Sequence, residues 1–218
     1  MSRTHTGRRA ATRKTPRGVL MLFVALLLAG AMLVVGTLVM RAHMPVDLNG
    51  NSVALGDGDV PDAGVIAEMQ VADDTGLRFT VPALSMNVPL GELSVVRSTL
   101  TPPGFVQAYR VRNLGVPLDK ASTGTVYVVM HSVNNGFAPG NYLFDVPSAK
   151  ALVNPGEALT VGGVDYVIDG SQLIDKTALP KTGKLWADVP GRVVVITCLQ
   201  RTQGRSLQNL VITGHLAA

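Results

Sequence analysis

The hydrophobic and polar positions divide the chain into three patterns. Residues 19–40 form an apolar run without a single charged side chain. Residues 41–76 are rich in Gly, Asp, Asn and Pro, and their apolar positions have no regular spacing. From about residue 77 the chain consists of short runs rich in Val, Ile, Thr and Tyr, which Gly, Pro and Asn separate. These patterns predict a long apolar helix, a linker and an all-β domain, in that order.

The apolar run is long enough to cross a membrane. As a helix rising ~1.5 Å per residue, Val19–Met40 spans ~33 Å, compared with the ~30 Å of a bilayer core. Residues 1–18 carry six basic side chains and no acidic one, whereas the other flank has Arg41 alone. This asymmetry predicts a single-pass anchor in the cytoplasmic membrane, with a basic cytoplasmic tail and the later residues outside the cell. A cleaved signal peptide is the alternative, because Ala29–Ala31 resembles a cleavage site, but the apolar run continues to Met40 and favours a retained anchor.

The net charge of +4 is a sum over unlike regions. Residues 42–76 carry seven acidic residues and no Lys or Arg, while residues 77–218 carry twelve basic and eight acidic residues. Nucleic-acid binding needs basic side chains clustered on a folded face, usually with stacking aromatics. Here the densest basic cluster is the tail, and aromatic residues make up 5% of the chain. We therefore expect no nucleic-acid partner, and we interpret residues 41–76 as a flexible acidic spacer.

The third region, residues 77–218, contains nine predicted strands at short intervals, which is typical of an all-β barrel or sandwich. A domain of this length buries enough surface to fold without a disulfide. Two of the runs, at residues 125–130 and 192–199, are almost continuously apolar, so we expect central strands buried on both faces. The predicted strands are Arg78–Leu84, Val88–Leu93, Phe105–Val111, Thr125–His131, Tyr142–Val146, Ala158–Val161, Asp165–Ile168, Arg192–Leu199 and Asn209–Leu216.

Each of the two apolar strands ends at a residue that can take part in chemistry. Cys198, the only cysteine, ends one strand before the polar loop QRTQGRS, and His131 ends the other. Free cysteine is among the most buried residue types, so an inert core thiol is the plain alternative. The loop cations Arg201 and Arg205 would stabilise a thiolate, which is the nucleophilic form. If the two strands are parallel neighbours, the imidazole and the thiol share one rim, as nucleophilic catalysis requires.

Several short motifs occur in an order that resembles a known family. They are VPALSMNVPL (81–90), VVMHSV (128–133), APGNYLFDV (138–146), and LW (185–186) followed by PGRVVVITC (190–198). VVVITC is similar to the TLxTC strand of the sortases, and VVMHSV is similar to their histidine strand. Residues 77–218 thus resemble the sortases, extracytoplasmic cysteine transpeptidases, and most closely the actinobacterial class E/F-like group. The predicted anchor and basic tail fit this resemblance.

The resemblance implies a closed eight-stranded sortase-like β-barrel, preceded by one N-terminal transmembrane helix. It implies that Cys198 attacks the Thr–Gly carbonyl of an LPxTG-like sorting signal and forms a thioester, while His131 donates a proton to the leaving amine. An amine from a peptidoglycan precursor or a pilin lysine then resolves the thioester. No metal cluster, phosphate-binding loop or dinucleotide motif is present in the sequence, so no cofactor is expected.

The third residue that the resemblance implies is an arginine that holds the substrate or the oxyanion. The family places it at the start of the strand after the cysteine, which aligns within one or two positions of Gln208. Gln208 carries no charge. Arg205 is therefore predicted to take this role, with Arg201 as the second choice.

Residues 179–183 read LPKTG, a complete match to a sorting signal. A sorting signal precedes a membrane-spanning run, whereas here charged residues and a short strand follow. We interpret the motif as a connection between strands, with a self-occluding pseudo-substrate as the alternative.

Two other functions compete with the transpeptidase. An L,D-transpeptidase also uses an extracytoplasmic cysteine, but it shows His-Gly-Cys where Thr197 precedes Cys198 here. A non-catalytic membrane-anchored β-sandwich adhesin would place Cys198 in the core, far from His131.

Overall fold

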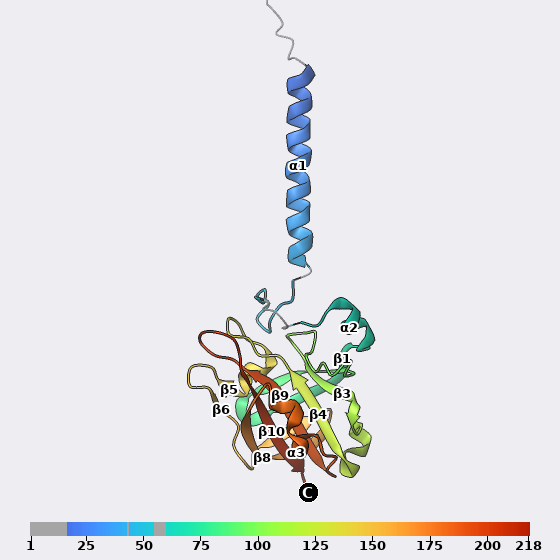
Figure 1. Ribbon diagram of the computed structural model, residues 1–218, viewed down its shortest axis with the longest axis vertical. Coiled ribbons are helices and arrows are strands. Elements are labelled where there is room, and N and C mark those ends of the chain that lie inside the picture. Colours follow the sequence, from blue (N-terminus) through green and yellow to red (C-terminus); the bar gives the residue numbers. More distant parts are fainter. Residues whose placement is uncertain (1–16, 43, 55–59) are drawn as a thin grey trace, which may run out of the picture. The chain divides into compact units, whose positions relative to one another are not determined.

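The computed structural model describes residues 17–42, 44–54 and 60–218 (Figure 1). The chain forms two compact units, divided between Met44 and Pro45. The first contains the helix α1 (Arg17–Ala42). The uninterrupted stretch of α1 whose side chains are described runs over residues 24–39, and its large apolar side chains are exposed. Among the described residues, no helix is long and apolar enough to cross a membrane.

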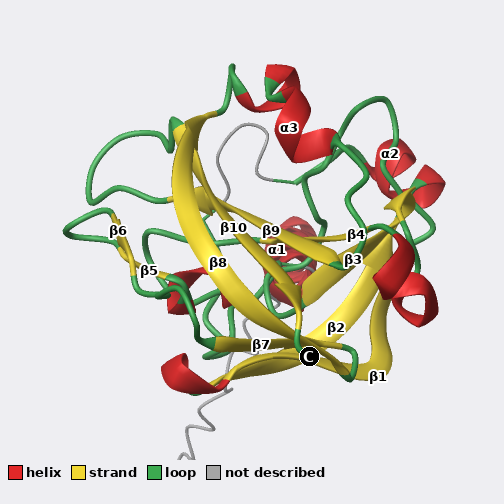
Figure 2. Ribbon diagram, turned by 90° about the horizontal axis from the view of Figure 1, so that it is seen from below, coloured by secondary structure: helices red, strands yellow, loops and turns green. Residues whose placement is uncertain are grey.

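The second unit is built on a closed barrel of eight strands (Figure 2). The predicted all-β fold and closed eight-stranded barrel are therefore confirmed. Around the barrel the order is β1-β2-β3-β4-β9-β10-β8-β7. The bounds are β1 (Ala72–Val81), β2 (Met86–Leu93), β3 (Ala108–Gly115), β4 (Thr125–Met130), β7 (Ala158–Val161), β8 (Val164–Asp175), β9 (Arg192–Leu199) and β10 (Gln208–Leu216).

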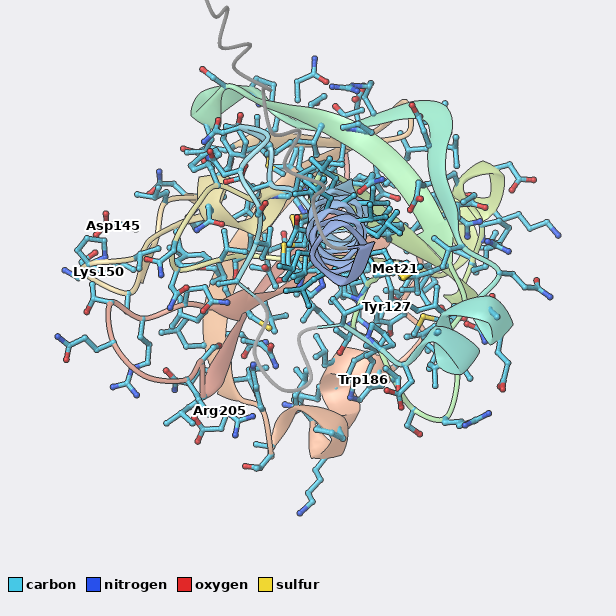
Figure 3. The ribbon with its side chains drawn as sticks, turned by 90° about the horizontal axis from the view of Figure 1, so that it is seen from above. Met21, Tyr127, Asp145, Lys150, Trp186 and Arg205 are labelled. Atoms are coloured by element: carbon cyan, nitrogen blue, oxygen red, sulfur yellow. The ribbon has the colours of Figure 1, made fainter. Side chains whose placement is uncertain are left out.

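Short elements connect the strands. A two-stranded hairpin, β5 (Phe144–Asp145) and β6 (Lys150–Ala151), pairs Asp145 with Lys150, both labelled in Figure 3. The remaining helices are α2 (Ala63–Glu68), α3 (Gly183–Trp186), and the 3-10 helices η1 (Pro82–Leu84), η2 (Leu118–Thr123), η3 (Pro139–Tyr142) and η4 (Leu179–Lys181).

Strands β4 and β9 lie side by side and parallel, from Thr125↔Arg192 to Met130↔Thr197. Both are predicted as central strands, and every residue of β4 is buried. Parallel strands buried on both faces read as continuous apolar runs, which explains the sequences of this pair. The pairing meets the condition under which His131 and Cys198 share one rim.

Alternate residues of these strands enter two different apolar clusters. Val128 and Val195 pack inside the barrel, together with apolar residues of the other strands. Val129 and Ile196 belong to a second cluster on the outer face, which Leu185 of α3 also enters. Alternation along a strand places successive side chains on opposite faces. In β4, β9 and β10, whether a residue number is odd or even (its parity) therefore indicates whether the side chain lies inside the barrel or on its outer face.

The stretch before the barrel differs from the predicted flexible spacer. Strand β1 begins at Ala72, and the described residues from Pro45 onward belong to the compact unit. Met69 is fully buried, and its carbonyl accepts a hydrogen bond from Ser94 N–H. This segment folds through local hydrogen bonds and single buried side chains rather than a periodic apolar face, so its pattern resembles that of a linker. Residues 1–16, most of the predicted basic tail, and residues 55–59 lie outside the described residues.

Candidate active site

The parallel pairing of β4 and β9 brings the two predicted residues to the same level. The register ends at Met130↔Thr197, so the next residues along the two strands are His131 and Cys198. Neighbouring strands lie ~4.8 Å apart. His131 shares its parity with Val129, and Cys198 shares its parity with Ile196, both members of the outer cluster. The imidazole and the thiol therefore leave adjacent strands toward the same outer face.

Two hydrogen bonds join the segments that follow β4 and β9, just beyond the last residue pair of these strands. Ser132 Oγ donates to the carbonyl of Cys198 at 2.5 Å. Gln200 Nε2 donates to the carbonyl of Ser132 at 2.8 Å. These two side-chain-to-backbone contacts join the segments that follow β4 and β9, so they hold the backbones of the two segments together beside His131 and Cys198.

His131 is held from two directions and is only 5% exposed. Its Nε2 lies 2.6 Å from the carbonyl oxygen of Pro102. A carbonyl can only accept, so Nε2 carries a proton in this bond, and Nδ1 is the nitrogen that can take up or release a second proton. The ring stacks on Phe105 with centroids 4.1 Å apart and an interplanar angle of 9°. Loop residues 102–105 thus fix both the tautomer and the plane of the imidazole.

The loop that follows His131 returns tightly to the barrel. Asn141 Oδ1 accepts from Val133 N–H at 2.9 Å and Ala138 N–H at 3.0 Å, and its Nδ2 donates to the Val133 carbonyl at 2.7 Å. Gly140 N–H donates to the His131 carbonyl at 2.7 Å. A Cβ at Gly140 would lie 2.1 Å from Thr197 Oγ1. The absence of a side chain here lets the histidine loop lie directly against β9.

The segment of residues 45–53, which precedes the barrel, packs against the loop that follows His131. Asp47 is 3% exposed, and its carboxylate accepts from Phe137 N–H at 2.9 Å, Asn49 N–H at 2.9 Å and Asn51 N–H at 2.8 Å. Burial raises the pKa of Asp47, but the hydrogen bonds from Phe137, Asn51 and Asn49 together lower it by more. The net effect is a pKa below the ordinary value of 3.8. The same segment places Val53 in an apolar cluster with Phe105, Val133 and Ala138.

Cys198 is partly exposed and forms no disulfide, as the only cysteine of the chain. The arrangement of the site therefore offers an accessible thiol beside an imidazole of fixed orientation. This is the set of groups that nucleophilic catalysis by cysteine uses. Within the described residues, no cluster of three or more His, Cys, Asp or Glu side chains could hold a metal ion.

The predicted arginine, Arg205 or Arg201, is not brought to Cys198 by any strand pairing among the described residues. Arg201 and Arg205 are exposed on the loop between β9 and β10, where Figure 3 labels Arg205. Gln208 has the parity of Leu210, which packs inside the barrel, so it lies on the face opposite to Cys198. Its Nε2 donates to Asp175 Oδ1 at 3.0 Å. The structure therefore does not bring Gln208 to the thiol.

Sequence reasoning missed several residues that shape the site. Phe105, Ser132 and Gln200 hold His131 or its strand, and Asn209 is the cross-strand partner of Cys198. Phe105 belongs to a different loop, and no local signal links it to His131. Asn209 could have been found by alternation alone, had the register of the β9–β10 hairpin been known.

The LPKTG motif occupies a folded turn and a helix start. Leu179 is buried against the outer cluster, with an exposed fraction of 8%. The Leu179 carbonyl accepts from Trp186 Nε1 at 2.9 Å, and the Thr182 carbonyl accepts from Leu185 N–H at 2.8 Å. The Thr182–Gly183 peptide therefore lies at the start of α3, and cleavage there would require local unfolding. This geometry agrees with the interpretation as a connection between strands.

Comparisons with known proteins give structural matches only. No protein-family model matches the sequence, and no curated protein matches it. Among solved structures, sortase A of Listeria monocytogenes matches at 15% identity and a TM-score of 0.46, over 65% of this chain and 86% of that one. Sortase C-1 of Actinomyces oris matches at 18% identity and a TM-score of 0.46, over 78% of this chain and 91% of that one.

A third match is the pilus-related sortase C of Group B Streptococcus, at 12% identity and a TM-score of 0.46, over 82% of this chain and 84% of that one. The resemblance to sortases that the sequence motifs indicate thus recurs among the solved structures. At these values the likeness does not assign an activity to the chain. The class E/F assignment stays a prediction.

Proposed function

We propose that this chain is a sortase-like cysteine transpeptidase in which Cys198 is the nucleophile and His131 the acid–base group. One observation carries the proposal: the parallel pairing of β4 and β9 sets the two residues level, on the same face, at the end of the two most apolar strands. A partly exposed thiol at this place supports a reactive role over a packing role. The resemblance of the sequence motifs to the sortases supports the same reaction.

The reaction proceeds by acyl transfer. The Cys198 thiolate attacks the carbonyl of the Thr–Gly bond in an LPxTG-like sorting signal, a sulfur–carbon bond forms, and the carbon–nitrogen bond breaks. His131 gives a proton to the leaving amine, which requires the imidazole to be protonated when the thiol is ionised. An amine acceptor, a peptidoglycan precursor or a pilin lysine, then attacks the thioester. It gives a proton back to His131 and releases the thiolate.

Arg205 contributes positive charge from the loop that follows Cys198, and Arg201 is the alternative source. A nearby cation favours the thiolate over the thiol. Both side chains are exposed, so their effect acts through solvent and depends on salt. The role that we assign to Arg205 is the one that the resemblance implies for an arginine, to hold the substrate or the oxyanion.

The proposed location follows from the apolar run over residues 19–40 and the basic residues before it. We propose a single-pass anchor in the cytoplasmic membrane, a cytoplasmic N-terminus and a catalytic barrel on the outer side. Secreted proteins that carry sorting signals are the partners proposed on this basis.

The competing functions place different demands on the thiol. A non-catalytic adhesin predicts a buried cysteine remote from His131, and the partial exposure and level register of Cys198 favour the enzyme over it. An L,D-transpeptidase has a His-Gly-Cys sequence, whereas Ile196 and Thr197 precede the cysteine here.

The test is to trap the thioester. The full chain, solubilised in detergent, is mixed with an LPxTG-type peptide, and intact-mass spectrometry measures the adduct on Cys198. We expect a mass increase equal to the peptide through its threonine, which hydroxylamine releases as a hydroxamate. The Cys198→Ala variant and a peptide with scrambled sequence serve as controls and show no adduct. An unmodified thiol with several sorting peptides overturns the proposal.

A further inference from the structure

The side chain directly opposite Cys198 is not one of the loop arginines. Strands β9 and β10 pair antiparallel, and Asn209 is the residue in register with Cys198. Side chains of directly opposed residues in such a pair lie on the same face, with Cβ atoms ~4.5–5.5 Å apart. No other residue of β10 can come as close to the thiol from this side.

Alternation along β10 confirms the face. Leu210 and Ile212 pack inside the barrel, whereas Val211 belongs to the outer cluster with Ile196 of β9. The irregularity in β10 pairing falls between Thr213 and Gly214, beyond this stretch. Asn209 therefore points to the outer face, where Cys198 and His131 also lie.

The carboxamide of Asn209 is nearly buried but has no hydrogen-bond partner among the described residues. The residue is 7% exposed, and buried amides are normally hydrogen-bonded. The oxygen and nitrogen of the carboxamide both keep some contact with solvent. The small exposed fraction thus includes the amide. A donor that is nearly excluded from solvent and has no protein partner is suited to bind a ligand acceptor atom.

We propose that Asn209 is the side chain that binds the reacting carbonyl oxygen, by donating a hydrogen bond from Nδ2. This inference rests on the proposed function. As the sulfur–carbon bond forms, the carbonyl oxygen gains negative charge, and the bond from Nδ2 strengthens. A preorganised donor in a dry site stabilises this charge more than water does. The charge collapses when the carbon–nitrogen bond breaks and His131 gives its proton to the amine.

A neutral donor here separates two tasks. The amide of Asn209 carries no charge, so it favours the oxyanion without strongly favouring the thiolate. Uncharged substitutions at position 209 should therefore change the rate of acyl transfer and leave the intrinsic reactivity of Cys198 toward a small alkylating reagent unchanged.

The experiment compares Asn209→Ala and Asn209→Asp with Gln208→Ala in the full chain. Gln208 is the adjacent residue on the opposite face, so its substitution is a matched control. We expect both Asn209 variants to lower the single-turnover acylation rate about 10²-fold. In Asn209→Ala, iodoacetamide alkylation of Cys198 should be unchanged across pH. Asn209→Asp keeps the size and removes the donor, but its carboxylate disfavours the neighbouring thiolate, so its alkylation should move to higher pH. Gln208→Ala should acylate as the parent does, and thermal unfolding checks that each variant is folded.

A peptide aldehyde ending in threoninal supplies a readout that does not need turnover. The thiol adds to the aldehyde carbon, and the resulting oxygen occupies the oxyanion position. We expect about 10²-fold weaker binding to Asn209→Ala than to the parent. Binding of the aldehyde that depends on Asn209, in a parent that never transfers an acyl group, contradicts the proposed function and retains only the role of Asn209 as the donor to an oxygen formed on a Cys198 adduct. Equal acylation and equal aldehyde binding by parent and Asn209→Ala overturn it, as does failure of the parent to bind the aldehyde.

Discussion

The two ends of the β4–β9 pair are built from the same kind of strand but treat their polar groups in opposite ways. At the N-terminal end, Thr125 is fully buried; its N–H donates to Asp188 Oδ1 at 2.8 Å, and its Oγ1 accepts from Val189 N–H at 2.9 Å. Arg192 donates to the carbonyls of Lys184 at 2.9 Å and Leu185 at 3.0 Å. At the C-terminal end, the Cys198 thiol is left partly exposed.

The network at the N-terminal end continues into the outer face. Tyr127 Oη donates to the Leu185 carbonyl at 2.9 Å, and its ring stacks on Trp186 with centroids 5.8 Å apart (Figure 3). Arg192 also donates to the Ala187 carbonyl. One end thus satisfies its buried donors and acceptors and fastens α3, while the other holds backbone atoms firmly and leaves side chains available. The difference is that polar side chains are paired at the N-terminal end, whereas the C-terminal end leaves Cys198 partly exposed, as the proposed nucleophile requires.

The largest effect should follow from removing the imidazole at the reactive end. His131→Ala should lower acyl transfer by about 10²–10⁴-fold, the usual contribution of a general acid–base. Steady-state kinetics with an LPxTG-type peptide and an amine measure it. His215→Ala is the matched control, because His215 pairs in register with Arg192 at the opposite end of β9 and is exposed. Equal loss in both variants, or none in His131→Ala, would show that the ends do not differ as described.

A smaller effect on a different quantity is expected at the N-terminal end. Arg192→Ala removes the guanidinium hydrogen bonds to the carbonyls of Lys184, Leu185 and Ala187, so the free energy of unfolding should fall by about 2–3 kcal/mol, with a Tm lower by about 5–10 °C. Denaturant unfolding measures the loss, and acyl transfer by the folded fraction should be retained. Arg192→Lys keeps the charge but has fewer donor directions, so its free energy of unfolding should lie between those of the parent and Arg192→Ala. A stable but inactive Arg192→Ala variant would contradict the separation of roles.

The smallest effect should come from the segment that supports the histidine loop. The pKa of Asp47 is lower in the folded state, so its contribution is complete above pH 3.8 and is lost as the pH falls through the folded value. Asp47→Asn should therefore destabilise the protein by about 1 kcal/mol at neutral pH. The difference from the parent should shrink in acid, as measured by denaturant unfolding at pH 7, 4 and 3. A difference that is independent of pH would exclude the charge of Asp47 as its source.

Much of the barrel follows from the pattern of the sequence. The bounds predicted for β7 and β9 are those observed, because apolar runs with clear turn signals specify them. Strand β8 extends to Asp175, whereas the prediction ended at Ile168, because its second half is polar and mostly exposed. Pairing with β10, from Gly170↔Thr213 to Asp175↔Gln208, holds that half in the sheet. A strand stabilised by its neighbour rather than by burial leaves little trace in its own sequence.

For the candidate site, the sequence allowed His131 and Cys198 to be predicted, because each ends an apolar strand and lies in a motif that resembles the family's; the structure places these strands side by side. Asn209 was not predicted, since the eight-residue loop 200–207 does not determine the register of the hairpin. The support from Asp47 was missed because hydrogen bonds that loop N–H groups donate to a carboxylate have no periodicity.

Gly140 sets a limit on how this protein can vary. A β-carbon at position 140 would lie 2.8 Å from the His131 carbonyl oxygen as well as against Thr197. Even alanine would have to push the histidine loop away from the cysteine strand. Directed evolution of this chain could vary the exposed loop residues Thr202 and Gln203 widely, but a library that randomises position 140 should return glycine, whatever substrate is used in the selection.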